Sequence, residues 1–399
     1  MTFLAGTTLR LKKREERRLL AGHLWVFSNE IDTANTPLKG VNPGTAVSLE
    51  SSTGKFLAHA YVNPASLIAA RVVSFKQSQP FTGELLRQRL MAALDLRRAR
   101  FEQPYYRWVH SEGDLLPGLV VDRFGDRLVV QITTAGMDQW QGEILECLQL
   151  LSGATAIQLA NDSRMRELEQ LPSLREWVLG EAPEYMIVQE NGLEFSVPSH
   201  IEQKTGWFYD HRMSRLELRR WVNGKRVLDV YSFLGAFGLN AASAGAESVL
   251  AIDSSSTAVD AANANAVRQK VADRFNAVQD DAVAKLRSLY EENERFDVIV
   301  VDPPAFVKRK KDLDSGRRHY ALVNRLALRL LNAGGIILSA SCSQAFSGEQ
   351  LRQVLRQAAP KEAQSVQILA SLAQGADHPM HAAMPETSYL KGFIARLIK

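Results

Sequence analysis

The residues best suited to chemistry are an aspartate and a cysteine that lie well apart in the sequence. Asp302 opens the segment Asp-Pro-Pro-Ala-Phe at 302–306, and Cys342 is the middle residue of Ser-Cys-Ser at 341–343. Two consecutive prolines fix φ and remove two backbone donors, so the segment should form a stiff arm that presents carbonyl oxygens and the Asp302 carboxylate. Such an arm suits a planar nucleobase, and Phe306 could stack on that base.

A thiol beside this arm would permit chemistry at a pyrimidine carbon. C5 of cytosine or uracil is too weak a nucleophile to take a methyl group directly, so a thiolate must first add at C6. A free thiol has a pKa of about 8.5, so Cys342 would need a nearby cation or proton acceptor. Asp302 would protonate or hydrogen-bond N3 as charge builds there. The base that then removes the C5 proton is not identifiable from the sequence.

Each of these residues also has an ordinary structural interpretation. A single cysteine near the end of a strand is often a small core residue. An Asp-Pro-Pro segment can be a rigid exit from a strand with Phe306 in the core, and an aspartate after a strand is often only a helix cap.

The elements that would position Asp302 and Cys342 begin near Gly224, where apolar runs alternate with helical stretches. This alternation predicts an α/β domain with a parallel sheet and crossover helices. The expected strands are 226–231, 248–253, 276–280, 298–302, 336–341 and 390–398. Ligands of such sheets bind at the carboxyl ends of the strands. The first five strands end near Asp229, Asp253, Asp281, Asp302 and Cys342.

The loop after the first of these strands indicates the kind of ligand. It contains Gly235 and Gly238 but lacks the full GxGxxG pattern that a dinucleotide pyrophosphate requires. S-adenosylmethionine has no phosphate; it needs a tight turn, acceptors for its ammonium group and a carboxylate for its ribose. Asp253 is placed to accept both ribose hydroxyls, and Asp281 would lie near the adenine amino group.

Charge and cysteine content narrow the class of protein. The formal net charge is only +4, but basic residues gather at 10–18, at 87–100, and at 308–311 with Arg317 and Arg318. These runs could contact RNA phosphates, or each could be a solvated face. Cys147 and Cys342 form no metal-ligand pattern, so neither a disulfide framework nor a metal site is expected. No apolar run is long enough for a membrane span, and the charged N-terminus does not suit a signal peptide, so a cytoplasmic location without a membrane partner is expected.

The rest of the chain predicts two further domains. Short strands at 24–27, 45–49, 56–61 and 68–75 indicate a small β-barrel. A helix at 83–101, a hairpin formed by 119–121 and 128–132, and a helix at 140–151 indicate a central α/β domain. Asn191-Gly192 predicts a second hairpin between 185–188 and 193–197. We therefore expect domains at 1–77, 78–190 and 191–399.

Several motifs together resemble a known family. These motifs are 302–306, 341–343, Gln203–Arg212 and Tyr389–Phe393, with Gly22–Glu30 and Gly54–Ala58 in the barrel. They are similar to those of the bacterial 23S rRNA cytosine-5 methyltransferases of the RlmI type. The resemblance implies an N-terminal PUA domain, a central α/β domain and a Rossmann-like class I methyltransferase domain that uses S-adenosylmethionine. It implies 23S rRNA or a large-subunit precursor as partner, with a homodimer as one arrangement.

The resemblance also assigns residues to roles. The catalytic cysteine of the family falls on Cys342, and its motif aspartate falls on Asp302. The cofactor contacts that it implies are Lys204, Gly206, Phe208, Asp229, Tyr231, Ser232, Gly235, Asp253, Ser254, Asp281 and Asp302. For 204–212, the alternative is a turn with an aromatic core anchor. Two other functions remain open, namely methylation of an exocyclic amine of guanine or adenine, which would not need Cys342, and an RNA-binding assembly factor without catalysis.

Overall fold

The computed structural model describes residues 7–201, 205–360, 363 and 365–398. The chain divides into two compact units. The first comprises Met1–Met186, Glu202–Trp207 and Ala376–Thr387, and the second comprises Ile187–Ile201, Phe208–Gly375 and Ser388–Lys399. The first unit contains the predicted domain 1–77 and residues 78–186 of the predicted domain 78–190, and these boundaries stay a prediction. No helix in the described part of the chain is long and apolar enough to cross a bilayer.

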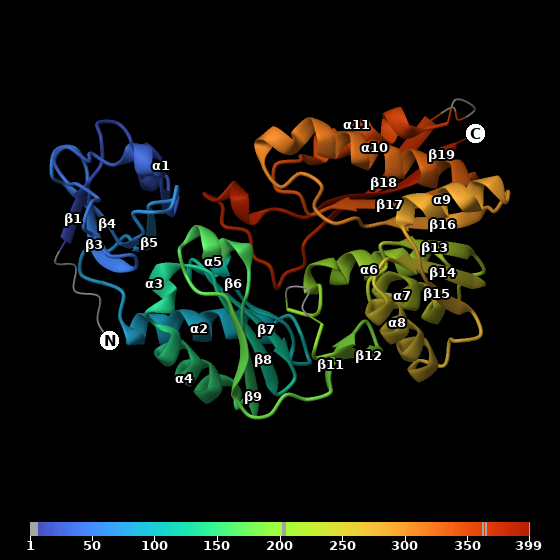
Figure 1. Cartoon of the computed structure of the whole chain (residues 1–399), viewed down its shortest axis with the longest axis horizontal. Helices are drawn as coiled ribbons and strands as arrows, with labels where there is room; N and C mark the ends of the chain where they lie inside the picture. Colours follow the sequence, from blue (N-terminus) through green and yellow to red (C-terminus); the bar gives the residue numbers. More distant parts are fainter. Residues whose placement is uncertain (1–6, 202–204, 361–362, 364, 399) are drawn as a thin grey trace. The chain divides into compact units, whose positions relative to one another are not determined.

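The first unit begins with a five-stranded sheet of order β1-β3-β4-β5-β2 (Figure 1). Its strands are β1 (Thr7–Arg10), β2 (Trp25–Val26), β3 (Thr45–Glu50), β4 (Phe56–Val62) and β5 (Ala70–Ser74). Alternating residues such as Val47 and Leu49 point into a common core. The four predicted strands are confirmed. Sequence analysis missed β1, because the basic run at 10–18 conceals the buried Leu9 and Leu11.

A second sheet in the same unit has the order β10-β9-β8-β7-β6. Its strands are β6 (Tyr105–His110), β7 (Leu119–Phe124), β8 (Arg127–Ile132), β9 (Ala156–Asn161) and β10 (Leu174–Leu179). The predicted helices are α2 (Gly83–Arg98) and α4 (Gln141–Ser152), and the short helices α3 (Ala135–Asp138) and α5 (Arg164–Leu168) accompany them. Thr82 caps α2 by accepting a hydrogen bond from the Leu85 amide. The predicted helices and the hairpin of β7 with β8 are confirmed.

Two arginines of the basic run at 87–100 have structural roles. Arg97 is fully buried and forms a bidentate pair with Asp114, at 2.6 and 2.7 Å. Arg89 donates to the backbone carbonyls of Val73 and Leu115. The interpretation of this whole run as a phosphate-binding surface is therefore wrong for these two residues.

The second unit begins with the hairpin of β11 (Tyr185–Glu190) and β12 (Leu193–Pro198). Asn191 and Gly192 join the strands with φ of 55° and 78°, as a type I′ turn requires. A seven-stranded sheet follows, with the order β15-β14-β13-β16-β17-β19-β18. All neighbouring strands are parallel except for β19, which is antiparallel to both β17 and β18. The predicted hairpin and parallel sheet are confirmed.

Helices cover both faces of this sheet. The strands are β13 (Arg226–Val230), β14 (Ser248–Asp253), β15 (Phe275–Gln279), β16 (Phe296–Val301), β17 (Leu331–Ser341), β18 (Ser365–Ala373) and β19 (Lys391–Ile398). One face carries α6 (Arg212–Leu218), α7 (Ala236–Ser243) and α8 (Ser256–Arg268), as Figure 1 shows. The other carries α9 (Ala282–Glu291), α10 (Leu313–Leu330) and α11 (Gly348–Ala358).

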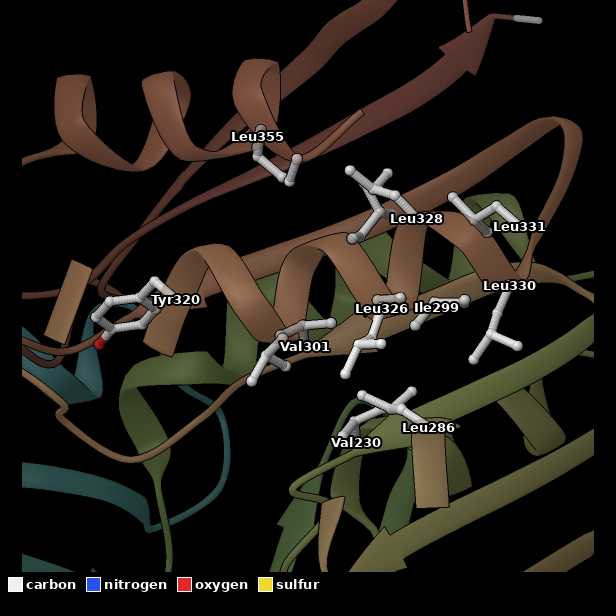
Figure 2. Packing of buried hydrophobic residues seen from close by; sticks show 14 of the residues in the cluster. Val230, Leu286, Ile299, Val301, Tyr320, Leu326, Leu328, Leu330, Leu331 and Leu355 are labelled. Atoms are coloured by element: carbon white, nitrogen blue, oxygen red, sulfur yellow. The ribbon is translucent and has the colours of Figure 1, made fainter. Parts of the chain in front are cut away.

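The core of this sheet fixes the two strands that end at the site. β16 is buried between its helix layers, and Figure 2 shows Ile299 and Val301 in one cluster with Leu326 and Leu330 of α10. Each fully buried branched side chain contributes about 1.5–3 kcal/mol. The same helix carries Tyr320, whose side chain is fully buried near the ends of the strands. The packing thus gives the carboxyl ends of β16 and β17 a rigid support.

Candidate active site

Asp302 and Cys342 follow neighbouring parallel strands. β16 ends at Val301, which pairs with Ser339 of β17, and β17 ends at Ser341. Both residues therefore lie at the same edge of the sheet. The side chain of Asp302 is 23% exposed, and Cys342 is half-buried. The structural interpretation of this cysteine expected a core residue, but Cys342 is only half-buried.

Hydrogen bonds hold the two segments together. The Val307 amide, at the end of the proline arm, donates to Ser343 Oγ at 3.1 Å. The Tyr320 hydroxyl lies 2.9 Å from Ser343 Oγ, and Ser341 Oγ donates to the Tyr320 oxygen at 2.7 Å. Burial raises the pKa of Tyr320, which keeps its hydroxyl protonated. Ser343 is thus bonded directly to the arm that carries Asp302, and Ser341 is linked to Ser343 through Tyr320.

Asp302 has a partner that sequence analysis did not identify. His211 Nε2 lies 3.2 Å from Asp302 Oδ2, and the imidazole is buried. Burial alone would lower the pKa of His211, but the charge and hydrogen bond of Asp302 outweigh it and raise that pKa. An imidazolium is therefore favoured beside the carboxylate. One oxygen of Asp302 is engaged by His211, and no bond from a described residue to the other oxygen competes with a ligand there.

A second ion pair supports the segment that carries His211. Arg215 of α6 forms a bidentate pair with the buried Glu190, at 2.5 and 2.8 Å. The same guanidinium donates to the Phe208 carbonyl at 2.8 Å. The short helix η3 (Tyr209–His211) is therefore anchored to the end of β11. Phe208 lies with its ring centroid 5.4 Å from that of Phe233, in the loop after β13.

The loop after β13 forms a tight turn with a strained backbone, and hydrogen bonds with neighbouring residues stabilise this turn. Tyr231, Phe233 and Gly235 have φ of 65°, 49° and 71°. Asp253 accepts from the Phe233 amide at 2.8 Å and from the Ser255 amide at 3.0 Å, so the end of β14 holds the turn. A Cβ at Gly235 would lie 2.9 Å from the Phe275 ring. The position therefore requires glycine both for its φ and for its space.

Asp229 lies below this turn and fits a cationic ligand. Its Oδ2 accepts from the Gly238 amide at 2.8 Å. Its Oδ1 and the Ser232 hydroxyl are buried and have no hydrogen-bond partner among the described residues. Burial, with smaller contributions from the charges of Asp302 and Asp253, raises the pKa of Asp229 to about 7. A buried acceptor of this kind is costly until a donor such as an ammonium group reaches it.

The other predicted cofactor residues have different surroundings. Asp281 is exposed and caps α9, accepting from the Ala284 amide at 2.8 Å, as the structural interpretation expected. Burial and the charge of Asp281 raise the pKa of Tyr231 to about 12, so these two groups are close enough to interact. Ser254 is exposed beside Asp253. Lys204 lies outside the described residues, and Gly206 belongs to the first compact unit.

A lysine at this edge was also missed. Lys391 begins β19 and pairs in register with Ser341, the residue before Cys342. Its ammonium donates to the carbonyl of Ser343, the residue after Cys342. Both Lys391 and His211 fall inside motifs that the sequence singled out, but only the fold brings them to Cys342 and Asp302.

Phe306 packs within the molecule rather than projecting as a free platform. Its ring centroid lies 4.9 Å from that of Tyr320, 5.5 Å from that of His319 and 6.3 Å from that of Tyr231. The side chain is only half-buried, so stacking of a base on its remaining surface stays a prediction.

Comparisons with known proteins agree with this geometry. A PUA-like domain model matches residues 9–75, and an S-adenosylmethionine-dependent methyltransferase model matches residues 134–392. The ribosomal RNA large subunit methyltransferase I of Salmonella arizonae is 36% identical over all of this chain and 99% of its own length. The same enzyme of Escherichia coli UTI89 is 35% identical over 97% of this chain and 98% of its own.

Solved structures show the same fold. A Streptococcus mutans structure described as an S-adenosylmethionine-dependent methyltransferase covers 98% of this chain and 100% of its own, with a TM-score of 0.83 at 21% identity. A methyltransferase complexed with S-adenosylhomocysteine has a TM-score of 0.85, the same identity and the same coverage. The PUA-like barrel, the α/β fold and the cofactor class predicted from the sequence are confirmed. The chain belongs to the S-adenosylmethionine-dependent methyltransferases and, among them, to the family of the ribosomal RNA large subunit methyltransferase I.

Proposed function

We propose that this protein transfers a methyl group from S-adenosylmethionine to C5 of a cytosine in large-subunit ribosomal RNA, through a covalent adduct between Cys342 and C6. The observation that carries the proposal is the half-buried thiol of Cys342 beside the Asp302 arm, joined through Ser343 and Val307. An enzyme that methylates an exocyclic amine has no use for a thiol at this position. The full-length relatives are named for large-subunit ribosomal RNA, which supports 23S rRNA or its precursor particle as substrate.

The loop after β13 would bind the cofactor. Asp229 Oδ1 would accept from its ammonium group, and Ser232 lies in the same turn with a buried hydroxyl to offer. Asp253 already accepts two backbone amides, and its remaining lone pairs would accept the ribose hydroxyls. Bound S-adenosylmethionine supplies an electrophilic methyl group. Tyr231, Gly235, Ser254, Asp281 and the family contacts at Lys204, Gly206 and Phe208 stay predictions.

The chemistry on the base would follow from Cys342 and Asp302. The Cys342 thiolate forms a bond to C6, and the electron pair of the C5–C6 double bond becomes available at C5. Negative charge moves toward N3, where Asp302 would pass on the proton that its hydrogen-bond partner, the His211 imidazolium, supplies. C5 would then form a bond to the methyl group as the bond between that methyl group and the sulfonium sulfur breaks, with S-adenosylhomocysteine as the leaving group. Loss of the C5 proton to a base restores the double bond and expels the Cys342 thiolate.

The test is transfer of labelled methyl groups to 23S rRNA by matched cysteine variants. Cys342→Ala should lose methylation by at least about a hundredfold, because the adduct cannot form. Cys147→Ala is the control, since Cys147 lies on α4 in the other compact unit and should leave the rate unchanged. RNA that carries 5-fluorocytidine should trap a covalent complex with the wild-type chain but not with Cys342→Ala. Methylation of RNA by Cys342→Ala at the wild-type rate would favour an amino-group methyltransferase instead.

A further inference from the structure

The proposed mechanism requires a thiolate at Cys342. The residues next to Cys342 in the chain are serines, which are neutral and do not stabilise a thiolate by charge. An ordinary thiol would be mostly protonated near neutral pH. The group that lowers the cost of the thiolate must therefore come from another element. At this edge the ammonium group of Lys391 lies close enough to Cys342 for their charges to interact.

Backbone register brings Lys391 to the cysteine. β19 runs antiparallel to β17, and Lys391 is paired with Ser341. The side chain then reaches past Cys342 so that its ammonium donates to the Ser343 carbonyl. The lysine is therefore fixed at both residues that flank the thiol. An ammonium has three N–H donors, so two remain after the bond to Ser343.

Among the described residues, no carboxylate competes with Cys342 for the charge of the Lys391 ammonium group. Burial lowers the pKa of Lys391 to about 8, and the charge that opposes this shift is that of Cys342. On β18 the residue opposite Lys391 is Ala373. At the start of α11, Gly348 lies against it, with an ideal Cβ there 4.0 Å from the Lys391 Cβ.

The other titratable groups near Cys342 have partners of their own. Tyr320 on α10 is hydrogen-bonded to Ser341 and Ser343. Asp302 at the end of β16 is paired with His211. Before β19, the Tyr389 hydroxyl donates to Asp210 at 2.6 Å. On α11, the Arg352 guanidinium lies over the Phe393 ring at 5.5 Å from its centroid.

We propose that Lys391 is the cation that holds Cys342 as a thiolate. The S–H bond breaks, its proton passes to water, and the thiolate remains beside the ammonium group as an ion pair. This role rests on the proposed covalent function, because Lys391 acts on the base only through Cys342. It makes Lys391 a positioning and activating residue, and it leaves the base that removes the C5 proton unassigned.

The experiment measures thiol reactivity rather than methylation. The full-length chain is treated with iodoacetamide over a range of pH without cofactor or RNA, and mass spectrometry follows the Cys342 and Cys147 peptides separately. In Lys391→Gln, the midpoint of the Cys342 alkylation profile should rise by at least about one pH unit, which is about a tenfold slower reaction on the acid side of the wild-type midpoint. Lys391→Arg should keep the wild-type midpoint, because a guanidinium remains charged.

The Cys147 peptide is the internal control, and its profile should be the same in all three proteins. An unchanged Cys342 midpoint in Lys391→Gln would overturn the proposal, and so would an Lys391→Arg profile that follows Lys391→Gln. These outcomes are separate from the fate of the proposed function. Loss of methylation in Cys342→Ala with an unchanged Lys391→Gln midpoint would reject this inference alone, whereas a shifted midpoint with active Cys342→Ala would reject the covalent mechanism alone.

Discussion

Replacement of Asp229 by Asn should stabilise the second compact unit and weaken its binding of the cofactor. The ordinary pKa of this carboxyl is 3.8, and burial raises the pKa of Asp229 to about 7 in the folded chain. Between these values the folded chain keeps a proton that the unfolded chain has released. Stability from this group is therefore lost as the pH rises from 3.8 toward 7, and the loss is complete above that range.

The magnitude follows from the size of this shift. Each pH unit in the window changes the free energy of unfolding by about 1.4 kcal/mol, so the wild-type chain should lose about 2 kcal/mol between about pH 5.5 and about pH 8 because of Asp229. Asn carries no charge and escapes this loss. In Asp229→Asn the side-chain amide occupies the buried position of the carboxylate, whose Oδ1 has no hydrogen-bond partner among the described residues. Burying the amide there has a free-energy cost, but this cost does not depend on pH. The stability advantage of Asp229→Asn should thus grow by about 2 kcal/mol over the same interval.

Hydrogen exchange of the amides of β13 is the appropriate assay. The chain has two compact units, so a single global unfolding curve would mix their transitions, whereas exchange reports the opening of this sheet. Asp260→Asn on the exposed surface of α8 removes the same charge and is the matched control. The affinity for S-adenosylmethionine, measured by calorimetry, should fall by at least about tenfold in Asp229→Asn alone. A stability difference that does not change with pH would refute the reasoning.

Three further outcomes follow from the site. Asp302→Asn should slow single-turnover methyl transfer by at least about a hundredfold while calorimetry shows cofactor affinity within about threefold of wild type; an unaltered rate would exclude the role at N3. Gly235→Ala should lower the free energy of opening of the β13 sheet by about 2 kcal/mol, since its Cβ meets Phe275 at a positive φ, and unchanged exchange would contradict this. Arg309→Glu with Lys310→Glu, both exposed, should weaken RNA binding and reduce its salt slope by about 2; an unchanged slope in filter binding would place this loop away from RNA. The homodimer stays a prediction that light scattering can test.

The strands that carry Asp302 and Cys342 were predictable because a parallel sheet is buried on both faces. The 298–301 part of β16 is a continuous apolar run, and the 335–341 part of β17 is buried throughout. By contrast, β18 escaped prediction, since most of its side chains are exposed and Gln367 and Ser371 interrupt its apolar residues. β1 escaped because it borders a basic run. Burial alone did not decide the outcome, because β9, in which every residue is buried, and β6, which is mostly buried, were not predicted either.

The partners of Asp302 and Cys342 depend on contacts that local patterns do not encode. His211 reaches Asp302 only because Arg215 and Glu190 anchor η3 beside the strand end. Lys391 reaches Cys342 only because β19 turns antiparallel and sets Lys391 against Ser341. For Arg97 the sequence analysis predicted a functional role that the structure does not support. It placed Arg97 among the candidate phosphate contacts, but the fold buries Arg97 against Asp114. A charge acquires its role from its partner, which a linear pattern does not specify.

The arrangement of charges explains why this sheet edge would select a cationic ligand. Asp302 and Asp253 both raise the pKa of the buried Asp229, so the carboxylates destabilise one another before any ligand binds. His211 offsets the charge of Asp302, and Arg215 offsets only a small part of that on Asp229. An incoming ammonium group would therefore gain both a hydrogen bond to Asp229 and the release of this repulsion. Neutralising Asp253 should lower the pKa of Asp229 and weaken binding together, a link between two strand ends that a site built from independent contacts would lack.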